Sequence, residues 1–234
     1  FNGPYRRYKP TIKKVDFKYA KDLFNLGLVF FVIQIAAIIQ FQTANIIIAR
    51  NFGTEDVTAY NIVFKYFGIV NMVFTIFITP FWSASTEAYQ NNDIQWIKNG
   101  IKKYTKLNIL LIFIGLIMLI VSDDIYKLWL GEGKVSIAFS LSLWGFLYFN
   151  VLIYGGKYVN FLNGISALRL QFISSLISPF IYIGVAMVLI KVYHLGVYSL
   201  FIASIIANFN AYLLSPIQYR MVIVKKSNSP IWYK

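Results

Sequence analysis

Long apolar stretches with few charged residues dominate the pattern of hydrophobic and polar positions along the chain. A helix that crosses a membrane needs roughly 17–25 such residues, because the hydrocarbon core is about 30 Å thick. Six stretches of this kind are present, covering residues 23–49, 57–82, 98–121, 135–156, 170–190 and 195–219. Most of the connections are short, so neighbouring helices should be antiparallel. The pattern therefore predicts an all-α fold, a polytopic transmembrane bundle of about six helices.

The composition supports a membrane protein. Of the 234 residues, 58% are hydrophobic and 13% are charged, whereas a soluble domain usually carries about 25% charged residues. A soluble fold must keep its surface wet and could not hide so much apolar side chain. The chain has no cysteine, which excludes disulfides and thiolate metal sites.

Lysine and arginine are distributed unevenly between the two predicted faces of the membrane. Most of them lie in residues 1–22, in residues 98–106 at the start of the third stretch, in the connection after the fourth stretch, and in the tail of residues 220–234. Such an excess marks the cytoplasmic side, so we expect both termini there, with 1–22 a basic cytoplasmic segment that meets membrane lipids. The net charge of +13 needs no nucleic-acid partner.

Polar side chains inside the predicted spans are the candidates for a binding site, because they are costly in lipid. Asn61, Lys65 and Thr75 fall on one face of the second helix, and Lys65 is the only charge placed well inside any predicted span. Gln34 and Asn45 share a face of the first helix. A hydrophilic cavity is favoured for the Lys65 face, with the ammonium meeting water or an anion such as phosphate. Snorkelling of Lys65 to the outer surface is the alternative.

Two further stripes and one acidic residue have more than one interpretation. The fifth helix aligns Gln171, Ser175, Ser178 and Tyr182, and the sixth aligns Ser204, Asn208, Ala211 and Ser215. Small and weakly polar stripes of this kind favour helix–helix contacts over cavity lining. Glu87 follows the second span. A salt bridge with the basic residues 98–106 and a gate at the cytoplasmic mouth are both open interpretations.

The sequence offers few groups for catalysis. His194 is the single histidine, and Asp123 and Asp124 are adjacent, without a third acid at a metal-binding spacing. No phosphate-binding G-x-x-x-x-G-K-[ST] loop and no nucleophile elbow occur. We therefore predict no catalytic residue, no metal and no cofactor; these absences argue against an enzyme without excluding one.

Several segments, taken together in their order and spacing, resemble a known family. They are TANIIIARNFG at 43–53, VTAYNI at 57–62, KYF at 65–67, PFWSASTEAY at 80–89 and WIK at 96–98. They resemble the oligosaccharide flippase (Wzx-type) family of polysaccharide-biosynthesis membrane proteins, in the superfamily of multidrug and toxin extrusion transporters. The resemblance is best over residues 19–106, and beyond them only hydropathy and helix count agree.

The resemblance implies a fold, a substrate and partners. Members of the family have two six-helix bundles around a central cavity, and this chain resembles the C-terminal bundle, with residues 1–22 as the linker. The implied function is alternating-access flipping of a polyprenyl-diphosphate-linked oligosaccharide across a bacterial inner membrane, for surface polysaccharide such as the O-antigen of lipopolysaccharide. The other bundle and polysaccharide-assembly enzymes are implied partners. Lys65 would bind the diphosphate, and Asn61, Thr75, Gln34 and Asn45 the sugar hydroxyls.

Two other functions remain open from the sequence. One is a multidrug exporter of the same fold, which Lys65 disfavours because cationic drugs prefer an acidic cavity. The other is a membrane enzyme of polysaccharide assembly, such as a polymerase or acyltransferase. One departure from an ion-coupled exporter is that no predicted span holds an intramembrane Asp or Glu.

Overall fold

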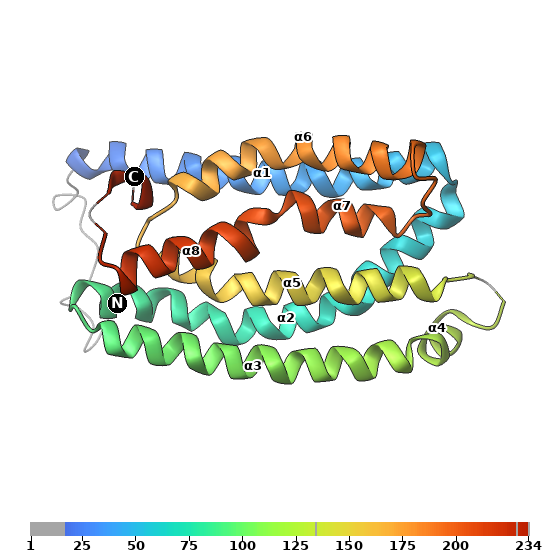
Figure 1. Ribbon diagram of the computed structural model, residues 1–234, viewed down its shortest axis with the longest axis horizontal. Helices are drawn as coiled ribbons and strands as arrows, with labels where there is room; N and C mark the ends of the chain where they lie inside the picture. Colours follow the sequence, from blue (N-terminus) through green and yellow to red (C-terminus); the bar gives the residue numbers. More distant parts are fainter. Residues whose placement is uncertain (1–16, 134, 228, 234) are drawn as a thin grey trace, which may run out of the picture.

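The computed structural model describes residues 17–133, 135–227 and 229–233, and all their regular secondary structure is helical. The long helices lie side by side along one axis (Figure 1). They are α1 (Ala20–Asn51), α2 (Thr54–Gln90), α3 (Ile94–Ile120), α5 (Phe139–Gly164) and α6 (Arg169–Lys191). Each of these five is long and apolar enough to cross a membrane. The short elements are η3 (Phe17–Tyr19), α4 (Ser122–Leu130) and η6 (Pro230–Trp232).

A bent pair of helices completes the bundle. It consists of α7 (Ser199–Ala207) followed by η4 (Asn210–Leu214), α8 (Ser215–Tyr219) and η5 (Arg220–Val224). The two parts, 199–207 and 210–224, meet at an angle of 46° and pass as a membrane span when taken together. Within the described residues the structure therefore has five spans, or six with the bent pair counted as one. The sequence prediction of an all-α bundle of about six helices is confirmed.

The bend lies at residues 208–209, immediately before a π-helical segment, and not at a proline. Residues Asn210–Leu214 form a π-helix, and such segments are a known cause of kinks. Gly155 of α5 faces it so closely that a Cβ atom there would lie 2.3 Å from the carbonyl oxygen of Ala211. Glycine at position 155 thus allows the two backbones to meet.

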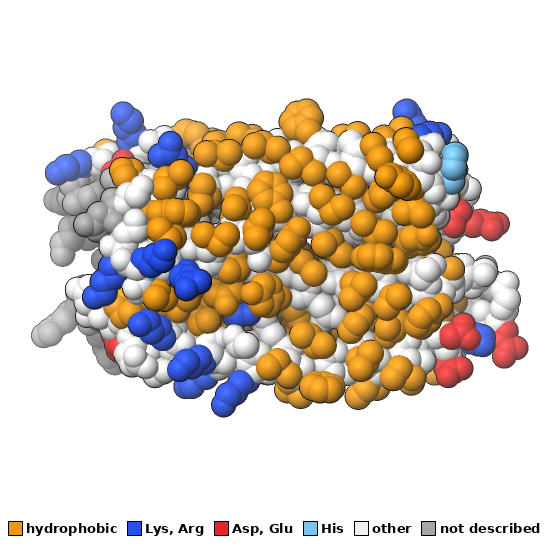
Figure 2. All heavy atoms as spheres, in the orientation of Figure 1, with side chains coloured by type: hydrophobic (Ala, Val, Ile, Leu, Met, Phe, Trp, Pro, Cys, Tyr) orange, Lys and Arg blue, Asp and Glu red, His pale blue; other side chains and the backbone are white. Residues whose placement is uncertain are grey.

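The chain reversals divide the bundle into two ends, shown at left and right in Figure 1. The α2–α3 turn, the α5–α6 turn and η6 lie at the left end, and the α1–α2 turn, α4 and the α6–α7 connection lie at the right end. Lys and Arg side chains gather mostly at the left and Asp and Glu mostly at the right in Figure 2. We call these the basic end and the acidic end.

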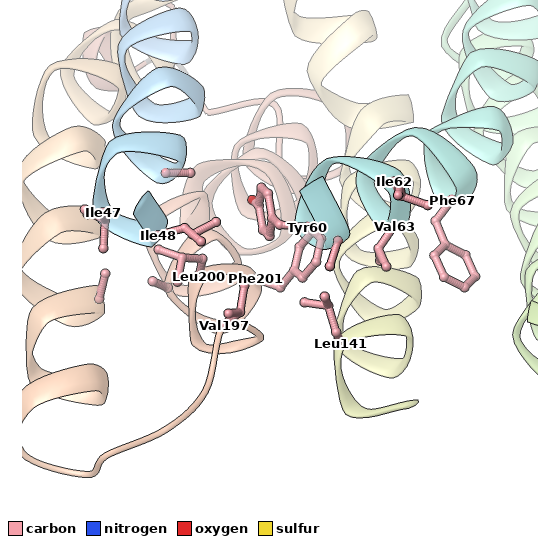
Figure 3. Packing of buried hydrophobic residues seen from close by; sticks show 14 of the residues in the cluster. Ile47, Ile48, Tyr60, Ile62, Val63, Phe67, Leu141, Val197, Leu200 and Phe201 are labelled. Carbon is pink, nitrogen blue, oxygen red and sulfur yellow. The ribbon is translucent and has the colours of Figure 1, made fainter. Parts of the chain in front are cut away.

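Apolar side chains fill the space between the helices in two clusters. The cluster nearer the acidic end joins residues of α1, α2, α5, α6 and α7 (Figure 3), together with Leu119 of α3 and Tyr126 of α4. In it Tyr60 stacks on Phe201 with ring centroids 4.6 Å apart. The second cluster, nearer the basic end, joins α2, α3, α5 and η5. Helices α2 and α5 contribute to both clusters and pack against each other more extensively than any other described pair, so they form the central pair of the bundle.

Candidate functional site

Helix α2 has one buried face and one exposed face over its whole length. Its buried face consists of Ala59, Tyr60, Ile62, Val63, Tyr66, Phe67, Val70, Phe74, Ile78, Phe81, Ser85 and Ala88. The exposed residues include several polar ones, namely Thr58, Lys65, Thr75, Thr79, Ser83 and Glu87. We call this set the polar face of α2. These polar residues alternate with exposed apolar ones, among them Ile69, Met72 and Ile76. A charged or strongly polar group on a spanning helix is costly in lipid and calls for contact with water or other polypeptide.

Lys65 is an exposed cation on that face, in the third of α2 nearest the acidic end. No carboxylate of the described residues forms a salt bridge with Lys65. Its neighbours one turn away on the same helix are Asn61 and Ile69. The ammonium is therefore uncompensated within the described part of the bundle, and it is free to meet an anion.

Two of the predicted site residues are joined directly. Asn61 of α2 donates a hydrogen bond from Nδ2 to Oδ1 of Asn45 on α1, at 2.8 Å. The same Nδ2 lies 2.8 Å from the carbonyl oxygen of Val57. Both side chains are half-buried. This amide pair ties α1 to α2 one turn from Lys65.

The remaining predicted residues lie farther along the two helices. Thr75 is exposed and bonds back to the carbonyl oxygen of Asn71 at 2.8 Å. Gln34 is exposed on α1. At a rise of about 1.5 Å per residue, Thr75 lies roughly 15 Å along α2 from Lys65, and Gln34 lies roughly 16 Å along α1 from Asn45. The structure brings Asn45, Asn61 and Lys65 together, and it leaves Thr75 and Gln34 outside that group.

Glu87 is exposed near the basic end of α2, and no described cation forms a salt bridge with it. The salt bridge with residues 98–106 is therefore absent from the described part of the structure. The adjacent Thr86 fixes this region by donating a hydrogen bond to the carbonyl oxygen of Gly164 at 2.7 Å. The role of Glu87 as a gate stays a prediction.

The polar stripes of the fifth and sixth predicted spans meet inside the bundle. Ser178 of α6 donates a hydrogen bond to the carbonyl oxygen of Ala207 at 2.8 Å. Beside this contact is a cavity of about 160 Å³, lined by residues that include Gln171 and Asn208. The stripes thus make a helix–helix contact and also line a small cavity.

A larger neighbouring cavity contains a polar residue that the sequence analysis did not select. Its volume is about 400 Å³, and its lining includes Gln40, Tyr60, Tyr148 and Asn208. Gln40 also lines the smaller cavity and is itself buried. The sequence does contain a pattern that indicates burial of Gln40. It lies three residues after Ala37 and four before Ala44, and small residues at this spacing mark a face that packs against other helices.

Lys157 is a buried cation that the sequence analysis placed in a loop. The fourth span was predicted to end at residue 156, but α5 continues to Gly164 and encloses Lys157 at 1% exposure. Its Nζ donates a hydrogen bond to the carbonyl oxygen of Tyr154 at 2.9 Å. It also lies 4.3 Å and 4.8 Å from the ring centroids of Tyr154 and Tyr158. Lys65 is therefore not the only charge inside a helix of spanning length.

The described charged groups outside the spans form no arrangement that suggests catalysis or metal binding. Lys127 and Asp123 form an exposed salt bridge on α4, and the hydrogen bond to Asp123 raises the pKa of Lys127. An exposed pair of this kind contributes little to stability. In the described part of the chain, no group of three or more His, Asp or Glu side chains is placed to hold a metal ion.

Comparison with known proteins identifies the family. The profile of the family described as "Polysaccharide biosynthesis protein" matches residues 5–136, which is more than half of the chain. Searches of curated proteins and of solved structures gave no match. The matched range covers α1, α2 and α3, and hence the amide pair, Lys65 and the polar face of α2. This multi-pass helical membrane protein belongs to the polysaccharide biosynthesis protein family, and its role is in polysaccharide synthesis or export.

Proposed function

We propose that the chain is one bundle of a flippase that moves a polyprenyl-diphosphate-linked oligosaccharide across a bacterial inner membrane for surface polysaccharide synthesis. The observation that carries the proposal is Lys65, an exposed cation without a carboxylate partner in the described residues. It lies on the exposed face of α2, where the polar residues of the polar face alternate with exposed Ile69, Met72 and Ile76. An ammonium at this depth needs water or an anion, and a diphosphate supplies the anion.

The neighbourhood of Lys65 suits a substrate that carries both phosphate and sugar. The Asn45–Asn61 amide pair lies one turn away, and amide groups can both donate to and accept from sugar hydroxyls. Thr75, Thr79 and Glu87 continue the polar face toward the basic end. A second bundle facing α2 would enclose this face in a water-filled space, and rocking of the two bundles would provide alternating access.

The charge distribution supports an orientation for this transport. Basic residues gather at the end that holds the α2–α3 and α5–α6 turns, and acidic residues gather at the opposite end (Figure 2). By the positive-inside rule the basic end, and with it both ends of the described chain, faces the cytoplasm. Glu87 then lies toward the cytoplasmic mouth, where we propose that it acts in gating.

Substitution of Lys65 tests the proposal in cells. In the gene product that contains this chain, expressed in its own host with the chromosomal copy deleted, we expect Lys65→Ala to abolish surface glycan while the protein accumulates normally in the membrane. Lys65→Arg keeps the charge and should retain part of the output. Lys191→Ala removes an exposed cation at the acidic end and is the matched control. Normal glycan output from Lys65→Ala would refute the role of Lys65.

A vesicle assay separates flipping from enzymatic modification. Purified protein is reconstituted with a lipid-linked oligosaccharide, and both the accessible leaflet and the mass of the substrate are measured. A flippase relocates the substrate at constant mass, and Lys65→Ala should stop the relocation. A change in mass would instead indicate a polymerase or a transferase.

A further inference from the structure

A groove on the outer surface between α2 and α3 has the features of a separate lipid site. Its volume is about 770 Å³, and it lies toward the basic end of both helices. Helix α2 contributes Phe77, Pro80, Phe81 and Ala84, and α3 contributes Trp96, Asn99, Gly100, Lys102, Lys103, Tyr104, Lys106 and Leu107. None of the residues of the polar face of α2 is among those that line the groove, so the groove is distinct from the Lys65 region.

Packing between the two helices shapes the aromatic wall of the groove. Phe81 lies against Gly100, where a Cβ atom would come within 2.6 Å of its ring. The same ring stacks on Trp96 with centroids 5.8 Å apart and an interplanar angle of 15°. Tyr104 donates a hydrogen bond from its hydroxyl to the carbonyl oxygen of Phe77 at 2.9 Å. The aromatic wall is therefore held in place by contacts on both helices.

Three lysines line the groove on one flank of α3. Lys102, Lys103 and Lys106 are exposed, no acidic residue lines the groove, and none of the three has a salt bridge among the described residues. Lys102 and Lys106 are four residues apart, a spacing at which like charges on a helix repel. Figure 2 shows basic side chains over this end of α3 beside hydrophobic ones. A bound anion would relieve the repulsion.

The combination points to one class of ligand. Tryptophan and tyrosine, represented here by Trp96 and Tyr104, are characteristic of the level at which lipid headgroups meet acyl chains. Clustered lysines at this level attract anionic headgroups. We propose that the groove binds an anionic phospholipid, with an acyl chain against Phe77, Phe81 and Leu107 and the headgroup phosphate against the three lysines.

Native mass spectrometry of the purified protein in non-ionic detergent tests the proposal. The probes are phosphatidylglycerol and phosphatidylcholine with identical acyl chains. We expect the protein to retain phosphatidylglycerol in preference to phosphatidylcholine. The Lys102→Gln/Lys103→Gln/Lys106→Gln variant should bind phosphatidylglycerol at least about tenfold more weakly, because each cation near an anionic surface contributes roughly fivefold.

Two controls separate a built site from general attraction to charge. The Lys21→Gln/Lys225→Gln/Lys226→Gln variant removes the same charge from exposed positions toward the same end and should bind phosphatidylglycerol like the unmodified protein. Ala84→Trp fills the groove without changing charge and should weaken binding, whereas Ala49→Trp, at an exposed position of α1, should not.

Two results would overturn the lipid site. One is equal retention of the two lipids, and the other is equal loss of phosphatidylglycerol from both triple-lysine variants. If Ala84→Trp fails to accumulate, the comparison of the two triple variants decides alone, because all six lysines are exposed on the surface. Loss of glycan export in Lys65→Ala with unchanged lipid binding would keep this site separate from the transport function.

Discussion

Lys65 and Lys157 both lie within helices long enough to cross a membrane, yet their surroundings differ in every respect. Lys65 is exposed on the polar face of α2 and has no salt bridge among the described residues. Lys157 is enclosed in α5, where a carbonyl oxygen accepts its hydrogen bond and two tyrosine rings face its ammonium. The comparison teaches that a cation satisfied by its own helix supports the fold, whereas an unsatisfied one is available for a ligand.

Reversing the charge at position 157 should cause the largest loss of stability. Lys157→Glu would bury a carboxylate beside the Tyr154 carbonyl oxygen and against the negative faces of two rings. An unpaired buried charge destabilises by about 3–5 kcal/mol, so we expect the melting temperature in detergent to collapse. Lys157→Met removes the charge, fills similar space and should cost less than about 1.5 kcal/mol.

The same substitution at position 65 completes the comparison of the two lysines. Lys65→Met should leave the melting temperature unchanged, because the side chain is exposed, and should lose glycan output. Lys157→Met should keep glycan output. The reverse result, with loss of output from Lys157→Met and retention in Lys65→Met, would break the distinction between the two lysines.

Alanine substitutions at two glycines, one near Lys157 and one near Lys65, test how tightly the backbone is packed beside each lysine. A Cβ atom at Gly155, two residues before Lys157, would lie 2.3 Å from the carbonyl oxygen of Ala211, and backbone cannot move aside easily. We expect Gly155→Ala to cost about 3 kcal/mol, at the upper end for overpacking. Gly68 lies three residues after Lys65, and its added Cβ would meet Phe149 at an ordinary 3.6 Å.

Gly68→Ala should therefore be neutral or stabilising by up to about 1 kcal/mol, since alanine has the higher helix propensity. The melting temperatures of the two variants, measured under one condition, give the comparison. Similar losses in both would mean that the α2–α5 interface at Gly68 has no more room than the contact between Gly155 and Ala211, and the difference in packing between the two regions would then be wrong.

Much of the fold was predictable because one physical requirement governs it. Backbone groups in lipid must be satisfied within the helix, so hydropathy alone predicts spans. The same reasoning failed at Lys157, because a charge was treated as the end of the apolar stretch, whereas local tyrosines and a carbonyl satisfy it within the helix. The bend before Asn210 was also beyond prediction, since no proline marks it in the sequence, and the close approach of Gly155 to Ala211 beside it is visible only in three dimensions.

The candidate site was predictable only in part. Helical periodicity places Asn61, Lys65 and Thr75 on one face of α2, but it cannot state which residues of another helix lie opposite. The Asn45–Asn61 bond depends on how α1 packs against α2. Gln40 was overlooked for a related reason, since its burial depends on α5, α6 and α7, which lie far from it in the sequence.

The Asn45–Asn61 amide pair should give the smallest change in stability, and it tests whether Asn45 belongs to the Lys65 region. A double-mutant cycle of Asn45→Ala and Asn61→Ala, followed by thermal unfolding in detergent, should give a coupling of about 0.6 kcal/mol, which is typical of hydrogen bonds between membrane helices. The coupling is modest because Asn61 keeps its contact with the carbonyl oxygen of Val57 when Asn45 is removed. Thr75 bonds only within its own helix among the described contacts, so a control cycle of Asn45→Ala with Thr75→Ala should give no coupling. If the two cycles agree, α1 is not held to α2 through this bond, and Asn45 no longer belongs with Lys65 in one site.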